Sequence, residues 1–279
     1  MRKTGILSAC AVAVLVVLVC FSWAGEEEVI NSIVAARTST KTFPLPSAQI
    51  PDLDLNKAYA LQRTLTERLV KSGHRIGGFK AGLTSEAGQK RFGVDRPLLG
   101  PLFKSGELEP GVSLEPKDFT RLFIEVEIGY LLGDKITEPV QDVETLKKKI
   151  KEVFPAVELP DLRFDDMKNL KGADIVVDAV SSSKYIVGRR MPADKVDVSA
   201  VSVILKLDGN EINKGQASDA LGDQWKALLW LVNSAVEQGW TLEPGYIFIT
   251  GALGNMLPGK PGKYEADWGS LGKISWTVK

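Results

Sequence analysis

The stretch Phe123–Ile128 alternates apolar and acidic side chains from Ile124 onward, and this alternation strongly constrains the fold. A period of two is typical of a β-strand, in which neighbouring side chains point to opposite faces. Glu125 and Glu127 would then share one face, while the opposite face is apolar enough to pack against a core. Two like charges held so close repel, and a cation between them makes the arrangement favourable. The alternative is a half-exposed strand with a solvated acidic face.

A third carboxylate, Glu158, lies in an otherwise apolar run, 154–160. A carboxylate in such a run is expensive to bury unless it is paired, protonated or bound to a metal. Together with Glu125 and Glu127 it would supply three oxygen ligands, a set that suits Mg²⁺, Mn²⁺ or Ca²⁺ and leaves positions for a chelating substrate. The alternative for Glu158 is an ion pair with Arg163 or a nearby lysine.

Two cationic residues are further candidates for chemistry. Lys80 lies in a strand-like segment flanked by glycines, which permit close approach of backbone or ligand, so it could hold a substrate carboxylate or stabilise an enolate. The alternative is an ordinary exposed strand lysine. His74 is the only histidine and follows Gly73 at a helix end, where it would either interact with the helix dipole or serve as a general acid–base.

Composition excludes some functions. Apolar residues make up 44% and charged residues 25% of the 279-residue chain, as in ordinary globular proteins. Thirty-five basic residues balance thirty-five acidic ones, so we expect no electrostatic binding of nucleic acid. No glycine-rich phosphate-binding motif stands at a strand end, which argues against a nucleotide cofactor.

The N-terminus has the features of a secretory signal. Arg2 and Lys3 precede an apolar run from Ile6 to Trp23, and small residues before position 25 suit cleavage after Ala24. We therefore predict a signal peptide over 1–24 and a periplasmic or secreted protein with no stable membrane anchor. An uncleaved N-terminal membrane anchor is the alternative. Because both cysteines lie inside this segment, the mature chain would have no cysteine ligand for zinc.

The remaining chain divides into an N-terminal helical region, 25–75, and a metal-binding β-roll catalytic domain, 76–279. The pattern predicts helices over 26–37, 54–72, 143–153 and 223–238, an irregular connection over 38–52, and strands near Phe79 and over 123–132, 175–180, 202–207 and 246–249. Strands separated by turns, with few helices between them, indicate an α+β fold with a mixed β roll.

Several short segments, in order and spacing, resemble the 2-keto-4-pentenoate hydratase family of the fumarylacetoacetate hydrolase superfamily. These segments are 58–62 (AYALQ), 78–85 (GFKAGLTS), 92–95 (FGVD), 125–128 (EVEI), 157–163 (VELPDLR), 251–253 (GAL), 261–262 (PG) and 266–272 (ADWGSLG). The resemblance covers roughly residues 55 to 279. It implies a mixed β roll with an N-terminal helical region, a homo-oligomer, and use of Mg²⁺ or Mn²⁺ to bind a small 2-oxo acid.

The resemblance also implies roles for single residues. It places the metal ligands on Glu125, Glu127 and Glu158, and the catalytic pair on Lys80 and Glu158. Further substrate-binding positions are Leu83, Ser182 and Lys184. Asp161 and Arg163 would hold the metal-binding glutamates in position without contacting the metal.

Three positions depart from the family pattern. Leu98 stands where the second acid of the family's Val-Asp-x-Pro-Asp segment belongs, Ala179 replaces an asparagine, and Lys184 replaces a glycine. The metal ligands are retained while polar groups near the substrate have changed. The first hypothesis is a divalent-metal-dependent, hydratase-like lyase acting on a small 2-oxo or 2-hydroxydienoic acid through an enolate. The alternatives are a 2-oxo-3-enedioate decarboxylase and a catalytically inactive carboxylate-binding relative.

Overall fold

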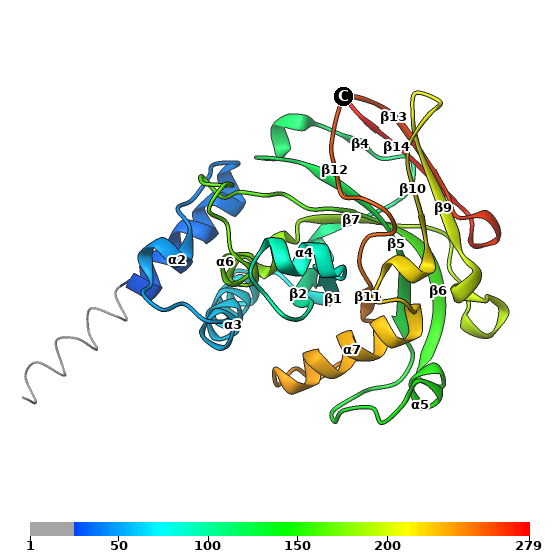
Figure 1. Ribbon diagram of the computed structural model, residues 1–279, viewed down its shortest axis with the longest axis horizontal. Helices are drawn as coiled ribbons and strands as arrows, with labels where there is room; N and C mark the ends of the chain where they lie inside the picture. Colours follow the sequence, from blue (N-terminus) through cyan, green and yellow to red (C-terminus); the bar gives the residue numbers. More distant parts are fainter. Residues whose placement is uncertain (1–24) are drawn as a thin grey trace, which may run out of the picture.

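The computed structural model describes residues 25–279 (Figure 1). The predicted signal peptide, 1–24, lies outside the described residues. Among the described helices, none combines the length and hydropathy that a membrane span requires.

Helices and strands alternate irregularly along the chain. The helices are residues 25–39, α2 (Pro46–Gln49), α3 (Leu55–Lys71), α4 (Glu86–Arg91), α5 (Val143–Lys147), α6 (Gly172–Val177) and α7 (Gln224–Glu237). The 3₁₀ turns are η1 (Lys104–Gly106), η2 (Pro116–Asp118), η3 (Ala179–Ser181), η4 (Ala193–Lys195), η5 (Val198–Ala200), η6 (Ala217–Asp219) and η7 (Gly269–Leu271). The strands are β1 (Ile76–Gly82), β2 (Leu98–Phe103), β3 (Glu107–Leu108), β4 (Ser113–Leu114), β5 (Phe123–Leu132), β6 (Ile150–Leu159), β7 (Lys184–Val187), β8 (Met191–Pro192), β9 (Ser202–Leu207), β10 (Asn210–Gln216), β11 (Ile247–Ile249), β12 (Leu257–Pro258), β13 (Gly262–Asp267) and β14 (Lys273–Val278).

The strands of residues 25–279 form two sheets. The larger has the order β2-β1-β11-β5-β6-β7-β3, with β12 added to β5 and β8 added to β6. The smaller has the order β10-β9-β13-β14-β4 and lies at the end of the molecule that carries the C-terminus (Figure 1). Most neighbours are antiparallel, while β1 pairs with β11, β3 with β7, and β14 with β4 in parallel. The predicted α+β class with a mixed sheet is therefore confirmed.

Two of the predicted helices are confirmed with their caps. Asp54 accepts a hydrogen bond from the Lys57 amide at the start of α3, and Asp223 accepts one from the Lys226 amide at the start of α7. Such side-chain oxygens satisfy amides that have no partner inside the helix. The helix predicted over 26–37 is also confirmed, within residues 25–39.

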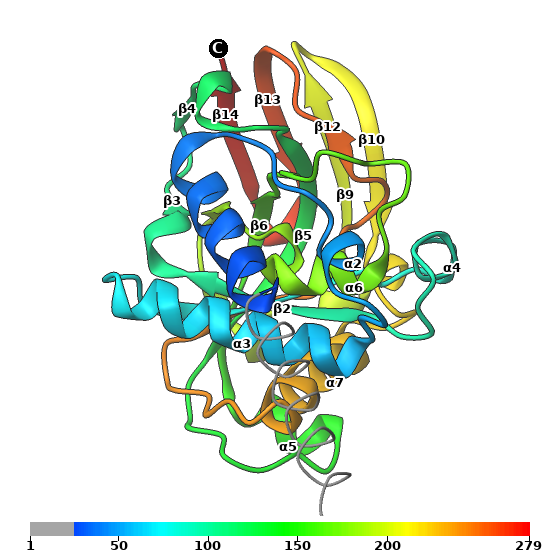
Figure 2. The same ribbon diagram turned by 90° about the vertical axis from the view of Figure 1, so that its left-hand side faces the viewer.

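The N-terminal helices cover one edge of the larger sheet. Figure 2 shows residues 25–39, α3, α2 and α6 gathered over β2. Their apolar faces form one buried cluster, in which Ile33 and Leu65 from the N-terminal region meet Leu98 and Val176 from later in the chain. Helix α7 contributes instead to the main core, which the two sheets share.

Two sequence predictions are wrong. Residues 175–180 form the end of α6 and part of η3 rather than a strand, because every residue of α6 is buried and leaves no helical periodicity to read. The helix predicted over 143–153 ends at Lys147, and β6 begins at Ile150. Pairing of β6 with β5 over almost its whole length overrides the local helical pattern there.

Candidate active site and metal centre

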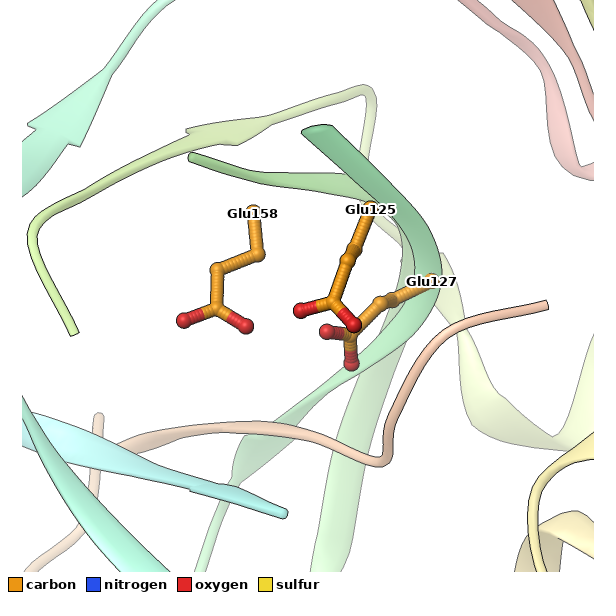
Figure 3. Close-up of side chains that lie close together, drawn as sticks. All are labelled: Glu125, Glu127 and Glu158. Carbon is orange, nitrogen blue, oxygen red and sulfur yellow. The ribbon is translucent and has the colours of Figure 1, made fainter. Parts of the chain in front are cut away.

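The pairing of β5 with β6 brings the three predicted glutamates together. Glu125 on β5 lies directly opposite Glu158 on β6, and side chains opposite each other in an antiparallel pair share a face. Glu127 follows two residues later on the same face, while Val126 between them is fully buried on the other. Figure 3 shows the three carboxylates pointing toward one another. One oxygen from each lies within 4.8 Å of the others.

These carboxylates are buried and incompletely hydrogen-bonded. Glu127 and Glu158 are 0% exposed, and the Glu125 side chain is 16% exposed. Oε2 of Glu127 accepts a hydrogen bond from the Gly251 amide at 2.6 Å. Within the described residues, Oε1 of Glu127 and Oε1 of Glu158 have no hydrogen-bond partner. An unsatisfied buried carboxylate oxygen is costly, and a divalent cation would satisfy it.

Burial and the neighbouring like charges raise the pKa values of all three glutamates. Burial, reinforced by the Glu158 carboxylate and opposed by Lys80, raises the pKa of Glu125 to about 8. Burial and the Glu125 carboxylate raise the pKa of Glu127 to about 8, and burial and Glu127 raise that of Glu158 to about 7, again against Lys80. The three carboxylates therefore need a nearby positive charge to ionise together, and their oxygens are ligands that suit a hard cation such as Mg²⁺ or Mn²⁺.

Lys80 on β1 supplies one positive charge beside this cluster. Its Nζ lies 2.7 Å from Oε2 of Glu158 and 3.9 Å from Oε2 of Glu125, and it donates a hydrogen bond to the Val180 carbonyl at 3.4 Å. Burial lowers the pKa of Lys80, but the three glutamates outweigh that effect and raise it, so the ammonium stays charged.

The ion pair between Lys80 and Glu158 decides between the alternatives that the sequence left open for these two residues. Lys80 is 3% exposed, so its interpretation as an ordinary exposed lysine is wrong. The alternative that Glu158 pairs with a nearby lysine is confirmed, because Glu158 forms an ion pair with Lys80. The ammonium lies nearest to Glu158, reaches Glu125 at 3.9 Å, and forms no ion pair with Glu127 within the described residues. Once all three carboxylates are ionised, the cluster with its one ammonium carries two negative charges, which match one divalent cation.

Asp161 and Arg163 form a separate buried pair. Arg163 Nη2 lies 3.0 Å from Oδ2 of Asp161, whose carboxylate also accepts hydrogen bonds from the Thr120 and Arg121 amides at 3.1 and 2.7 Å. Arg163 therefore does not pair with Glu158. The pair fixes the chain immediately after β6, which carries Glu158.

The predicted substrate-binding residues are not all in one place. Leu83, with a left-handed backbone (φ 53°), lines a cleft that also contains Glu125. Ser182 is buried and donates to the Pro101 carbonyl at 2.8 Å. The Lys184 ammonium lies 5.0 Å from the centre of the Phe119 ring, a cation–π contact, and does not line this cleft.

The remaining residues named from the sequence, His74, Leu98 and Ala179, contact other parts of the structure. His74 Nδ1 lies 2.9 Å from Oγ of Ser105, and its ring stands edge-on to Phe103. No contact between His74 and the glutamates is present in the described chain. Leu98 and Ala179, the two apolar replacements, are fully buried.

The cleft has a volume of about 540 Å³ and lies between the end of β1, helix α4 and the loop that follows β11. The cleft is also lined by larger side chains that the sequence did not indicate: Arg91, Asp219, Asn255 and Met256. The signal available for Arg91 is its position in the last turn of the helix that follows the Lys80 segment. A larger hollow, about 720 Å³, lies between α3 and α7 and contains none of the three glutamates.

Comparison with known proteins gives a consistent result. No protein-family model matches the chain. A 2-keto-4-pentenoate hydratase from Paraburkholderia xenovorans (strain LB400) is 32% identical over 252 residues, which cover 89% of this chain and 93% of that protein. A 4-oxalocrotonate decarboxylase from a Pseudomonas species is 30% identical over 225 residues, covering 80% of this chain and 87% of the relative.

A solved structure shares the fold. The 4-oxalocrotonate decarboxylase from Pseudomonas putida G7, complexed with magnesium and adipate, superposes with a TM-score of 0.85 at 24% identity, covering 90% of this chain and 96% of that one. This likeness confirms the fold expected from the resemblance. With a β5–β6 glutamate cluster, a buried lysine and extensive identity to the hydratases, the chain belongs to the 2-keto-4-pentenoate hydratase family.

Proposed function

We propose that this protein is a divalent-metal-dependent, hydratase-like lyase that acts on a small 2-oxo or 2-hydroxydienoic acid through an enolate. The observation that carries the proposal is the convergence of three buried glutamates, two of them with an unsatisfied oxygen, beside a buried ammonium. Hydratases at 30% identity or more over most of the chain support the same reaction class.

Each residue has a separate part in this proposal. Glu125, Glu127 and Glu158 would hold Mg²⁺ or Mn²⁺, with Ca²⁺ as a further candidate. When bound, the ion supplies a Lewis acid that polarises the carboxylate and 2-oxo oxygens of a chelating substrate. Lys80 supplies a fixed positive charge that orients the substrate carboxylate or stabilises the negative charge of the enolate. Because the site is largely buried, these charges act more strongly than they would in water.

The test is turnover of a panel of 2-oxo acids and 2-hydroxydienoates by metal-loaded protein. Wild type should hydrate a dienoate, and the double variant Glu125→Ala, Glu127→Ala should lose turnover and Mn²⁺ binding together. Glu144→Ala is the matched control, because Glu144 lies on α5, far from the glutamate cluster in sequence, and forms a surface ion pair with Lys147. Full turnover by the double variant would contradict the proposal. A protein that binds Mn²⁺ and is stabilised by oxalate, yet is inert on every compound, would instead be a carboxylate-binding relative.

A second candidate reaction is decarboxylation of a 2-oxo-3-enedioate, and Arg91 favours it. Arg91 lines the cleft together with Glu125, and within the described residues it forms no ion pair. Arg91 is exposed, and a second carboxylate at the far end of the substrate could form a charge-assisted hydrogen bond with it. The decarboxylase relative at 30% identity fits a substrate of this kind.

Arg91→Gln tests the second candidate. We expect it to lower kcat/KM for an enedioate by about tenfold or more, with little effect on a monocarboxylic dienoate. Lys90→Gln is the control, since Lys90 is exposed on the same helix and does not line the cleft. Release of carbon dioxide separates decarboxylation from hydration. An equal effect of Arg91→Gln on both substrates would remove the basis for an enedioate.

We also propose that the protein is exported and forms a homo-oligomer. Export is supported by the basic and then apolar N-terminus, Arg2 to Trp23, and the oligomer by the family resemblance. Cell fractionation with N-terminal sequencing of the product should find a chain that begins at Gly25 outside the cytoplasm. Light scattering of the purified protein should give a multiple of the chain mass. A full-length cytoplasmic chain or a monomer would contradict the respective proposal.

A further inference from the structure

Arg37, near the end of the helical residues 25–39, contacts Asp178 and Ser182, which lie 141 and 145 positions later in the chain. Its Nε donates to Oδ1 of Asp178 at 3.0 Å, its Nη2 donates to the Asp178 carbonyl at 2.8 Å, and its Nη1 donates to the Ser182 carbonyl at 3.1 Å. Both side chains are largely buried, with 10% of the arginine and none of the aspartate exposed. The guanidinium therefore bridges the two ends of the segment 178–182.

The segment that Arg37 bridges has an unusual backbone. Its three central residues all have left-handed φ angles: Ala179 at 53°, Val180 at 55° and Ser181 at 54°. None of them is glycine, and left-handed conformations in consecutive residues with side chains are disfavoured. Such a turn persists only when its surroundings hold it in place. A guanidinium with several donors in a rigid plane is well suited to fix both ends.

This turn contacts the proposed catalytic machinery directly. The Val180 carbonyl accepts the hydrogen bond from Lys80, and the Ser181 carbonyl accepts one from the Asp161 amide at 3.1 Å. The turn also packs against two glycines of the sheet. A Cβ at Gly82 would lie 2.5 Å from the Val180 side chain, and one at Gly100 would lie 2.4 Å from the Ala179 carbonyl oxygen. A shift of the turn would therefore move the only backbone carbonyl that orients the Lys80 ammonium in the described structure.

We propose that Arg37 is a positioning residue for the active site: it holds the left-handed turn 179–181 in place, and the turn in turn orients Lys80. The charge of Arg163 also favours the Asp178 carboxylate, but its guanidinium donates hydrogen bonds to Asp161 and the Ser183 hydroxyl and does not bridge the two ends of the turn. The inference rests on the proposed function only through the role of Lys80. It assigns no part to Arg37 in holding the metal, whose ligands lie on β5 and β6.

Docking of the N-terminal helix is a distinct role with its own contacts. Val29, Ile30 and Ile33 are buried in the apolar cluster, and Glu27 forms an ion pair with Arg68 of α3 at 2.7 Å. Arg68→Ala therefore loosens the same helix without touching the turn, which makes it the matched control for Arg37→Ala. Arg37→Lys keeps the charge but cannot bridge both ends of the turn with one planar group.

The experiment measures Mn²⁺ affinity, oxalate affinity of the Mn²⁺-loaded protein, kcat and KM for wild type, Arg37→Ala, Arg37→Lys and Arg68→Ala. For Arg37→Ala we expect kcat and oxalate affinity to fall by about 10- to 100-fold, because small misplacement of a catalytic group has effects of that size, while Mn²⁺ affinity stays within about twofold. Arg37→Lys should recover only part of the loss. Added guanidinium at millimolar concentration should partly restore Arg37→Ala, and equal sodium chloride should not.

Oxalate binding separates this inference from the proposed function. If wild type is inert on every substrate but binds oxalate, the proposed function fails while the effect of Arg37 on Lys80 is still measured. The inference is overturned if Arg37→Ala behaves like Arg68→Ala, or if it lowers Mn²⁺ affinity as much as oxalate affinity. Should Arg37→Ala fail to fold, Arg37→Lys and the circular-dichroism melt of each variant supply the comparison, and an unchanged oxalate affinity in Arg37→Lys contradicts the inference.

Discussion

Lys80 carries a positive charge in a place where burial lowers its pKa. The three glutamates raise its pKa above the ordinary value, and the nearest carboxylate oxygen is 2.7 Å away. The same ammonium lies beside the ligands that would hold a metal ion, so it repels that ion while it attracts the substrate. Lys80 therefore weakens binding of the metal ion while it favours turnover of the substrate.

Replacement of Lys80 with methionine should separate the two contributions. We expect Lys80→Met to bind Mn²⁺ about tenfold or more tightly, since one positive charge beside the ligands is gone, and to lose turnover by about 100-fold or more. Isothermal titration with Mn²⁺ and steady-state kinetics measure the two effects. Lys90→Met, an exposed change on α4, should alter neither. Weaker Mn²⁺ binding by Lys80→Met would contradict the assignment of Lys80 as a neighbour of the metal ligands.

The sequence predicted the three glutamates but not the surroundings of the other residues. Alternation along 123–128 set the face of Glu125 and Glu127, and the apolar run around Glu158 indicated that it would be buried. The partner of Lys184 was not predictable, because the Phe119 ring that it contacts lies sixty-five positions earlier (184 − 119) in an irregular segment. Arg37 was missed for the same reason, since its partner Asp178 lies 141 positions away.

Strand β1 owes its place to a glycine. A Cβ at Gly78 would lie 1.8 Å from the Ile247 carbonyl oxygen of β11, and the backbone there has a φ of +151°. The parallel pairing of β1 with β11, which aligns Lys80 with Ile249, depends on this close approach. Any side chain at position 78 must therefore push the two strands apart.

Gly78→Ala should lower the free energy of unfolding by about 3 kcal/mol or more, because the clash is with backbone atoms that cannot move aside. Urea denaturation measures the change. Gly111→Ala is the matched control, since Gly111 also has a positive φ, +87°, but a Cβ there meets nothing within 4 Å. It isolates backbone strain, for which we expect only about 1 kcal/mol. Equal losses in the two variants would show that close approach of β11 does not matter.

The helices that the sequence predicted well are those with one exposed face. Helix α3 has a clear apolar stripe and an N-cap at Asp54, and its predicted range is confirmed nearly to the residue. Helix α6 is buried on all sides, so its residues give no periodicity and are easily mistaken for a strand. The end of α5 is set by the partner strand β5, which lies outside the local window of sequence.

The N-terminal region, 25–75, shares its apolar cluster with segments from later in the chain. Phe103 on β2 and Ile175 on α6 are buried against it. A fragment of residues 76–279 therefore tests whether the predicted boundary at residue 75 separates two independently folding domains. We expect this fragment to lack a cooperative unfolding transition and to bind a hydrophobic dye, because it exposes that apolar face. A chain of residues 25–279 is the control. Cooperative unfolding of the fragment would establish two independent domains.

Metal binding should stabilise the whole molecule. An ion that binds the folded chain alone adds about 2.7 kcal/mol at one hundred times its Kd, so EDTA should lower Tm and excess Mg²⁺ should restore it. The double variant Glu125→Gln, Glu127→Gln should melt at one temperature with or without Mg²⁺. It keeps the shape of the site and removes the charges that attract the ion. A Tm of wild type that ignores both EDTA and Mg²⁺ would contradict the proposed metal centre.

Anomalous diffraction from crystals soaked in Mn²⁺ and oxalate locates the metal ion and the substrate analogue in one experiment. We expect one Mn²⁺ peak between Glu125, Glu127 and Glu158, with oxalate chelated to it and a carboxylate oxygen of oxalate near the Lys80 ammonium. A Mn²⁺ peak elsewhere, or Lys80 filling the space between the three carboxylates at saturating Mn²⁺, would contradict this prediction.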